Sequence, residues 1–269
     1  MIPSAHYAVF GNPVAHSKSP QIHQAFAEQE GVKIVYEKIA VSEADFEAAV
    51  QHFFDTGGKG ANITLPFKVR ACRWADSLSA DAECAGAVNT LLPGADGIRG
   101  ENTDGIGLTR DISRNLDFNL SRKRILLLGA GGAVRGVIQP LLNASPSELV
   151  VANRTPEKAA ALAEEFAVSA CPFDRLCGRF DIIINGTSGS LDGSVPDIPS
   201  SLFERAGLVY DMVYGSEPTA FLRHAAEQGA QYTADGLGML VEQAAFSYHM
   251  WRGFRPDTAP VIRMLRENL

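Results

Sequence analysis

Residues 60–68, GANITLPFK, end an apolar strand-like segment with an amide, a hydroxyl and an amine. Strand alternation directs Asn62 and Thr64 to the face opposite the apolar residues, which include Leu65. Lys68 follows after a proline turn. Ligand sites of α/β proteins commonly lie beyond the ends of strands. The segment therefore predicts Asn62, Thr64 and Lys68 at a ligand, with a surface lysine at a helix start as the alternative for Lys68.

Two serines stand before a predicted helix in the segment NPVAHSKSP, residues 12–20. Ser19 and Pro20 have the pattern of an N-cap and a first helical residue, which leaves Ser17 without a structural role. Free N–H groups and the helix dipole favour an anion at such an end. Two hydroxyls there indicate a carboxylate site.

Further polar residues gather between positions 86 and 105. Asn89 interrupts an apolar segment, and Asn102, Thr103 and Asp104 follow a turn-rich stretch. Each is compatible with a turn or a buried hydrogen bond. Their number in a short region favours a polar site.

A glycine loop lies in LLLGAGGAVRG, residues 126–136. Gly129, Gly131 and Gly132 follow a predicted strand and precede a predicted helix, where backbone N–H groups can approach a pyrophosphate. Val134 replaces the third glycine of the GxGxxG motif, so a structural turn is the alternative. The surrounding strand–helix–strand pattern favours a dinucleotide.

The next strand ends without the acidic residue that an NAD site normally uses for the ribose 2′-OH. Asn153 stands there, followed by Arg154 and, four residues later, Lys158. Thr155 and Pro156 have the pattern of a helix cap and first helical residue. A solvated surface charge is the alternative for Arg154. With the glycine loop, these residues predict a 2′-phosphate site and therefore NADP.

Two sets of alternating strands and helices position these residues, so the fold class is α/β with two domains. From residue 125 onward, the expected strands, which would form a parallel sheet with helices on both faces, are 125–128, 149–152, 181–185, 207–212 and 230–234. Their helices include 157–167 and 218–229. The first hundred residues predict strands 7–11, 34–41, 61–65 and 87–92, helices 19–31 and 42–57, and a hairpin at 93–100, hence a mixed sheet. A last helix is expected at 237–251.

Composition excludes several classes of protein. The formal net charge of −7 argues against general nucleic-acid binding. No run of 18 apolar residues and no signal peptide is present, so a cytoplasmic protein without membrane spans is expected. The histidines show no metal-binding spacing. The four cysteines, Cys72, Cys84, Cys171 and Cys177, lack CxxC spacing and are expected to be reduced core residues.

The chain resembles the shikimate dehydrogenases almost from end to end. The resemblance rests on nine motifs in family order: GNPVAHSKSP, NITLPFK, GAVNTL, GENTDG, GAGGA, NRT, NGTS, YDMVYG and GLGMLVEQA. It implies a substrate domain of residues 1–103 plus 238–269, a Rossmann-like doubly wound NADP domain of residues 104–237, and a cleft between them. The implied reaction is reversible reduction of 3-dehydroshikimate to shikimate by NADPH.

The resemblance also implies roles for single residues. Ser17 and Ser19 would hold the shikimate carboxylate, and Lys68 with Asp104 would be the catalytic pair. The residues expected to bind the rest of the substrate are Thr64, Asn89, Asp104, Tyr214 and Gln243. The residues expected to line the cofactor are Gly129, Ala130, Gly131, Gly132, Ala133, Asn153, Arg154, Thr155, Lys158, Thr187, Met212 and Gly236. Lys158 stands where some members carry arginine, which weakens the expected phosphate clamp.

Two alternatives remain at this point. One is a quinate/shikimate dehydrogenase that uses either cofactor, against which Arg154 and the absent acid count. The other is a regulatory protein that binds such ligands without catalysis, against which the retained pair of Lys68 and Asp104 counts. The expected assembly is a monomer or a homodimer.

Overall fold

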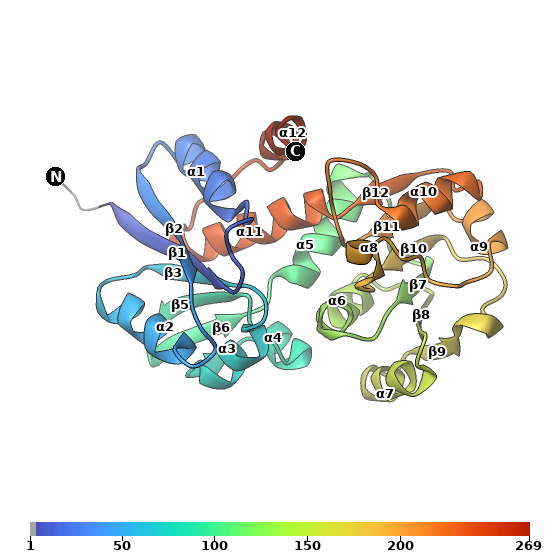
Figure 1. The fold of residues 1–269 in the computed structure, drawn as a ribbon, viewed down its shortest axis with the longest axis horizontal. Coiled ribbons are helices and arrows are strands. Elements are labelled where there is room, and N and C mark those ends of the chain that lie inside the picture. The colour runs from blue at the N-terminus through green and yellow to red at the C-terminus, as the bar shows by residue number, and fades with distance from the viewer. Residues whose placement is uncertain (1–3) are drawn as a thin grey trace. The chain divides into compact units, whose positions relative to one another are not determined.

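The chain divides into two compact units in the computed structural model, which describes residues 4–269 (Figure 1). The first unit comprises the residues through Asp104 together with Val241–Arg263. The second comprises Gly105–Leu240 and Met264–Leu269. Each unit contains its own six-stranded sheet, so the predicted two-domain α/β fold is confirmed.

The first unit contains a mixed sheet in the order β2-β1-β3-β5-β6-β4. Parallel pairing joins β1 to β2 and β3, whereas β5 runs antiparallel to β3 and β6. Its elements are β1 (Ala5–Gly11), α1 (Ser19–Glu30), β2 (Ile34–Ala40), α2 (Phe46–Asp55), β3 (Gly60–Ile63), α3 (Lys68–Trp74), β4 (Ser77–Leu78), α4 (Ala80–Ala85), β5 (Thr90–Gly94) and β6 (Gly97–Glu101). The C-terminal helices α11 (Leu237–Arg252) and α12 (Ala259–Glu267) each begin in one unit and end in the other.

Both faces of the first sheet are covered by helices. Ala8 and Phe10 of β1 lie in a core with Phe46 of α2 and Phe67. The rings of Phe46 and Phe67 stack with their centroids 4.5 Å apart. Tyr7, on the other face of β1, stacks on Trp251 of α11 with ring centroids 4.9 Å apart. Figure 1 shows α1 and α11 on this second face. Period-two alternation in β1 thus supplies apolar residues to two cores.

Two expected strand boundaries beside the polar residues are wrong, and the strand expected at 230–234 begins only at Thr233. β3 ends at Ile63, so Leu65 lies beyond the sheet and is 70% exposed instead of facing the core. β5 begins at Thr90, so Asn89 precedes the strand instead of lying inside it. Asn89 leaves the regular strand where its side chain donates hydrogen bonds to Thr103 and Asp104.

The second unit contains an all-parallel sheet in the order β12-β11-β10-β7-β8-β9. This is the doubly wound order of dinucleotide-binding domains, with the switch point between β7 and β10. Its elements are α5 (Asp104–Arg110), a π-helix (Asp111–Asn115), β7 (Arg124–Leu128), α6 (Gly132–Asn143), β8 (Glu148–Asn153), α7 (Pro156–Phe166), β9 (Ser169–Pro172), a 3₁₀ turn (Phe173–Arg175), β10 (Ile182–Asn185), α8 (Gly189–Asp192), α9 (Ser201–Glu204), β11 (Leu208–Asp211), α10 (Ala220–Glu227) and β12 (Thr233–Asp235). The Rossmann-like prediction is confirmed.

Alternate residues of these strands enter two separate cores. Ile125 and Leu127 of β7 pack in one core with residues of α6 and α7, whereas Leu126 and Leu128 pack in the other with residues of α9 and α10. The strands are therefore apolar on both faces, as expected for a parallel sheet that is covered on both sides.

The cysteines are free thiols, and the prediction that they are core residues is met only in part, since Cys72 and Cys171 pack against cores of the two units. Cys72, Cys84 and Cys171 are partly buried and Cys177 is exposed. Burial raises the pKa of the Cys72 and Cys171 thiols. Among residues 4–269, no helix is long and apolar enough to cross a membrane.

Candidate active site

Lys68 and Asp104 contact each other in the first unit. Lys68 Nζ donates a hydrogen bond to Asp104 Oδ2 over 2.6 Å. The lysine begins α3, and the N–H of Asp104 donates to Asn102 Oδ1 over 3.1 Å at the start of α5. The side chains are 27% and 18% exposed, so both are accessible to a ligand. A lysine and a carboxylate at this distance can take up or release a proton together.

The other carboxylate oxygen of Asp104 accepts a hydrogen bond from Asn89. The distance between Asn89 Nδ2 and Asp104 Oδ1 is 2.9 Å. Asn89 also donates to Thr103 Oγ1 over 2.9 Å, and the Thr103 hydroxyl lies 3.1 Å from Gln243 Oε1. Asn89 and Thr103 are buried. The fold thus brings predicted residues from three distant segments into one hydrogen-bonded group.

Ser17 and Ser19 lie in the loop after β1 and at the start of α1. The Ser17 hydroxyl donates to Ser19 Oγ over 3.1 Å and accepts from the Ser19 N–H over 3.3 Å. The predicted N-cap role of Ser19 is wrong, because the helix starts at Ser19 itself and Lys18 is the N-cap. Ser17 is the serine whose hydroxyl accepts from a backbone N–H of the first turn.

Thr64 lies in the loop after β3, beside the loop that carries the serines. β1 and β3 are parallel neighbours, and the Asn12 N–H donates to Leu65 O over 3.0 Å, so the two loops meet at the carboxyl edge of the sheet. The Thr64 side chain is partly buried, and its hydroxyl makes no hydrogen bond within the described chain.

Asn62 does not face a ligand, contrary to the prediction. It is buried, and its amide oxygen accepts from Tyr36 over 2.6 Å and lies 3.1 Å from His23 Nε2. Its amide nitrogen donates to Thr90 Oγ1 over 3.1 Å and lies 3.3 Å from Ser247 Oγ. These partners occupy the hydrogen-bonding groups of the Asn62 side chain. Asn62 therefore links β2, β5 and the helices α1 and α11 within the first unit.

His23 makes the stability of the protein dependent on pH. The side chain is fully buried, and burial lowers its pKa to about 3, although the hydrogen bond with Asn62 acts in the opposite direction. Between about pH 6.5 and about pH 3, His23 binds a proton in the unfolded chain but not in the folded one. The free energy of unfolding therefore falls as the pH falls through this range. We expect the free energy of unfolding to drop by about 1.4 kcal/mol between roughly pH 7.5 and pH 5.5 from this residue alone.

Urea unfolding of wild type and of His23→Gln at the two pH values measures this contribution. The variant should lose about 1.4 kcal/mol less than wild type over the interval. His16→Gln, which changes an exposed histidine, is the matched control. Equal losses in wild type and His23→Gln would contradict the prediction.

The glycine loop of the second unit lies at the switch point of the parallel sheet. Gly129 has φ of +112°, and a Cβ there would lie 3.2 Å from the backbone of Gly186, which follows β10. A Cβ at Gly131 or Gly132 would meet no described atom within 4 Å. No side chain caps the N-terminus of α6, and Ala133 in its first turn is exposed. The loop and this helix end thus present free N–H groups to an anion.

Two cations follow the end of β8. β8 ends at Asn153, whose amide donates to Thr155 O over 3.0 Å, and Thr155 is the N-cap of α7 as predicted. Arg154 and Lys158 are exposed, and neither forms an ion pair within residues 4–269. The strand therefore ends at a neutral residue, Asn153, instead of a carboxylate, and two cations follow it, with Glu157 between them.

Met212 and Gly236 contact each other in the second unit. A Cβ at Gly236 would lie 2.2 Å from Met212 O, so only glycine fits there. The Met212 sulfur lies 3.0 Å from the Cβ position of Gly186 beside the glycine loop. Thus three predicted cofactor segments are neighbours.

Thr187 and Tyr214 complete the predicted set in this unit. The Thr187 hydroxyl donates to Asn185 Oδ1 over 2.8 Å, which fixes the loop after β10. Tyr214 is partly buried, and burial, followed by the charge of Asp235, raises the pKa of its phenol. Tyr214 belongs to the second unit, whereas the other predicted substrate residues belong to the first.

Three family models match the chain. They are the shikimate dehydrogenase substrate binding domain over residues 9–91, shikimate/quinate 5-dehydrogenase over 111–192, and the shikimate 5′-dehydrogenase C-terminal domain over 236–266. A shikimate dehydrogenase (NADP(+)) of Cellvibrio japonicus is 54% identical over 269 residues, which cover 98% of this chain and 97% of the relative. The chain belongs to the shikimate dehydrogenase family.

Solved structures agree with the fold. A shikimate 5-dehydrogenase from Thermus thermophilus, in complex with NADP(H) and shikimate, is 35% identical with a TM-score of 0.89, and the match covers 98% of this chain and 100% of that one. An Ael1 enzyme from Pseudomonas putida is 49% identical with a TM-score of 0.95, covering 97% and 98% of the two chains.

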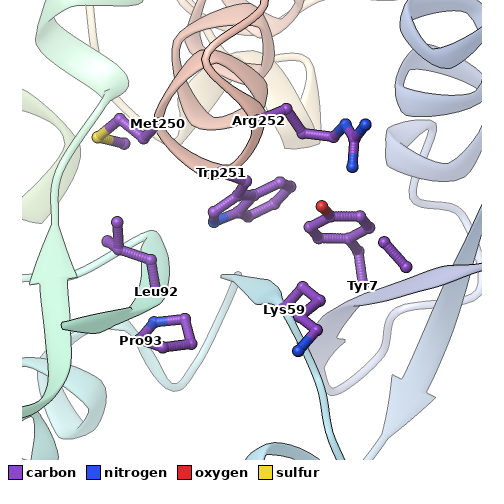
Figure 2. A pocket seen from close by; sticks show the side chains of 8 residues that line it. Tyr7, Lys59, Leu92, Pro93, Met250, Trp251 and Arg252 are labelled. Carbon is purple, nitrogen blue, oxygen red and sulfur yellow. The ribbon is translucent and has the colours of Figure 1, made fainter. Parts of the chain in front are cut away.

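A separate pocket of about 350 Å³ lies in the first unit of this shikimate dehydrogenase family member (Figure 2). Tyr7, Lys59 and Trp251 line it, near the starts of β1 and β3 rather than their carboxyl ends. Trp251 Nε1 already donates to Leu91 O over 3.1 Å, and Arg252 is paired with Glu30. None of the predicted site residues lines this pocket.

Metal binding has no support in the described part of the chain. No group of three or more histidine, cysteine, aspartate or glutamate side chains is placed to hold an ion within residues 4–269. The polar site of this family member is built from amides, hydroxyls and the Lys68–Asp104 pair.

Proposed function

We propose that the chain is an NADP-dependent shikimate dehydrogenase that interconverts shikimate and 3-dehydroshikimate, in the pathway that leads through chorismate to aromatic amino acids. The observation that carries the proposal is the contact of 2.6 Å between Lys68 Nζ and Asp104 Oδ2, beside the amide of Asn89. Identity of 54% to relatives named shikimate dehydrogenase (NADP(+)) supports the substrate and the cofactor.

Lys68 and Asp104 form the proposed acid–base pair. Oxidation of the secondary alcohol removes a hydride from carbon and a proton from oxygen. NADP, when bound, accepts the hydride, and NADPH returns it in the reverse direction. The pair takes up the hydroxyl proton and gives it back to the carbonyl oxygen.

The substrate contacts are proposed on the same residues that the sequence predicts. The paired hydroxyls of Ser17 and Ser19 stand at the N-terminal end of α1 and suit a carboxylate. The residues proposed to bind the ring hydroxyls are Thr64, Asn89, Asp104 and Gln243, with Tyr214 contributed by the second unit. The partly buried Thr64 hydroxyl, which has no partner within the described chain, supports its role.

The cofactor residues fit NADP. The open glycine loop and the uncapped N-terminus of α6 suit the pyrophosphate, and Arg154 with Lys158 suits the 2′-phosphate. The full proposed set is Gly129, Ala130, Gly131, Gly132, Ala133, Asn153, Arg154, Thr155, Lys158, Thr187, Met212 and Gly236. We propose residues 1–103 plus 238–269 as the substrate domain and 104–237 as the NADP domain of a cytoplasmic monomer or homodimer.

One assay tests the function. Purified protein is incubated with shikimate or quinate and with NADP or NAD, and formation of reduced nicotinamide is followed by absorbance. We expect the highest kcat/KM for shikimate with NADP. Absence of activity with shikimate would reject the function, and comparable activity with quinate and NAD would favour the dual-specificity alternative.

Ser17→Ala should act on substrate binding. A charge-assisted hydrogen bond contributes about 1.5–3 kcal/mol, and the lower end applies because the Ser17 hydroxyl also bonds Ser19. We therefore expect the shikimate KM to rise roughly tenfold. The KM for NADP should stay near the wild-type value.

Steady-state kinetics and melting temperatures of Ser17→Ala and Ser19→Ala separate binding from stability. Ser42→Ala is the matched control, since Ser42 is an exposed serine of the same unit that bonds Asp45. An unchanged shikimate KM in both test variants would remove the serines from the site.

A further inference from the structure

The hydroxyl of Thr90 lies in a buried group of polar side chains behind the proposed acid–base pair. Thr90 is the first residue of β5 and is fully buried. Its Oγ1 lies 3.0 Å from Asn89 Oδ1, 2.7 Å from Ser247 Oγ and 3.1 Å from Asn62 Nδ2. Thr90 and Ser247 were absent from the predicted site, although Ser247 stands four residues after Gln243 on one helix.

The donors and acceptors of this group allow a chain of hydrogen bonds that reaches Asn89. The side-chain amide nitrogen of Asn62 is a donor and cannot accept a hydrogen bond. Thr90 Oγ1 is therefore the acceptor in its contact with Asn62.

Thr90 Oγ1 donates to Asn89 Oδ1 over 3.0 Å when the Ser247 hydroxyl donates to Thr90. Gln243 O, 3.1 Å from Ser247 Oγ, is the other acceptor for the Ser247 proton. The chain of hydrogen bonds runs from Ser247 through Thr90 and Asn89 to the carboxylate of Asp104.

Asn89 has to present its amide nitrogen to Asp104 in this arrangement. Its oxygen accepts from the Thr103 N–H over 2.9 Å and from the Thr90 hydroxyl. The nitrogen is thereby directed to Asp104 Oδ1, opposite the oxygen that Lys68 contacts. The Thr103 contact alone prevents an amide flip, so the Thr90 contact fixes the finer position of the amide.

We infer that Thr90 is a positioning residue that acts through Asn89 on the carboxylate of Asp104. The inference rests on the proposed function, because it assumes that Asp104 takes part in proton transfer. Thr90 itself contacts no ligand in this scheme. It sets the alignment of a group whose position determines the rate of the proton transfer.

Thr90→Val tests the inference, because valine keeps the shape of threonine and lacks the hydroxyl. We expect kcat to fall roughly 3- to 20-fold, since Asn89 loses the neutral hydrogen bond from Thr90 and keeps the one from the Thr103 N–H. The contacts of Thr90 with Asn62 and Ser247 are lost as well. The KM for NADP should not change. Thr90→Ser restores the hydroxyl and should have a kcat within about twofold of wild type.

The control and the second readout separate positioning from stability. Ser79→Ala removes the N-cap of α4 in the same unit, so it should lower the melting temperature and leave kcat unchanged. A kcat of Thr90→Val equal to that of wild type or of Thr90→Ser would overturn the inference. If Thr90→Val does not fold, Thr90→Ala replaces it, because it also removes the hydroxyl that contacts Asn89, and an unchanged kcat in that folded variant has the same meaning.

Nuclear magnetic resonance of the Asn89 side-chain amide gives a result that does not depend on activity. The resonance is identified by its loss in Asn89→Ala. It should shift in Thr90→Val and return in Thr90→Ser, and an unshifted resonance in Thr90→Val would overturn the inference. Failure of the wild-type protein to oxidise shikimate would contradict the proposed function. The resonance measurement would still show whether Thr90 positions Asn89.

Discussion

Lys68→Ala is expected to lower kcat by roughly 10²–10⁴-fold, the usual effect of removing an acid–base group. The shikimate KM should change little, because the lysine acts on the proton that moves in the transition state rather than on ground-state binding. Its contact of 2.6 Å with Asp104 places the amine beside the carboxylate that would share this proton. Steady-state kinetics with saturating NADP measure both constants.

Lys59→Ala is the matched control for this experiment. Lys59 is an exposed lysine of the same unit, just before β3, whereas Lys68 follows the end of that strand. Its kcat should equal that of wild type. A Lys68→Ala enzyme whose kcat stays within about threefold of wild type would remove Lys68 from the mechanism, since loss of a general acid–base group costs far more.

Arg154→Ala is expected to raise the NADP KM by roughly 10- to 150-fold and to leave the NAD KM almost unchanged. The planar guanidinium can bind a phosphate through two hydrogen bonds, and a charge-assisted contact contributes about 1.5–3 kcal/mol. Arg154 is exposed directly after β8 and has no ion-pair partner within the described chain, so its charge is available to a ligand. Lys158 adds a second positive charge nearby, which Glu157 partly opposes.

Comparison of kcat/KM for NADP and NAD in wild type and variant measures the effect. Arg205→Ala is the control, since this exposed arginine precedes β11 and therefore lies toward the opposite end of the strands. Equal use of both cofactors by the wild-type protein would contradict a phosphate site at Arg154. A similar rise of both KM values in Arg154→Ala would indicate a general effect on the domain instead.

The sequence alone predicted what depends on local pattern. Apolar segments that alternate with helix-length stretches indicated the parallel sheet of the second unit, and β7, β8, β10 and β11 lie where those segments are. The glycine loop after β7 was recognisable from its composition, and Gly129 has the positive φ of +112° that favours glycine. The absence of an acid after β8 was likewise visible in the order of residues.

Two short strands, β4 and β9, were not predicted from the sequence. β4 has two residues, too few to establish a period. β9, with the sequence SACP, lacks the apolar run of β10 and β11, which are equally short but buried. The strand at 61–65 was predicted two residues too long, because the alternation of Asn62, Thr64 and Leu65 continues past the point where hydrogen bonding to β5 stops. Alternation of side chains in the sequence shows where a strand can form. The residue at which the strand ends depends on hydrogen bonding to the neighbouring strand.

Tertiary structure alone decided which polar side chains are enclosed by structural partners and which remain accessible. Asn62 and Thr64 look equivalent in the sequence, yet Asn62 is enclosed by Tyr36, His23 and Thr90, and Thr64 keeps an unpaired hydroxyl. A side chain bonds whatever the fold brings within about 3 Å of it, and those partners lie far away in the sequence. For the same reason the pairing of Lys68 with Asp104, 36 residues apart, and the support of Asn89 by Thr90 and Thr103 became visible only when the chain was folded.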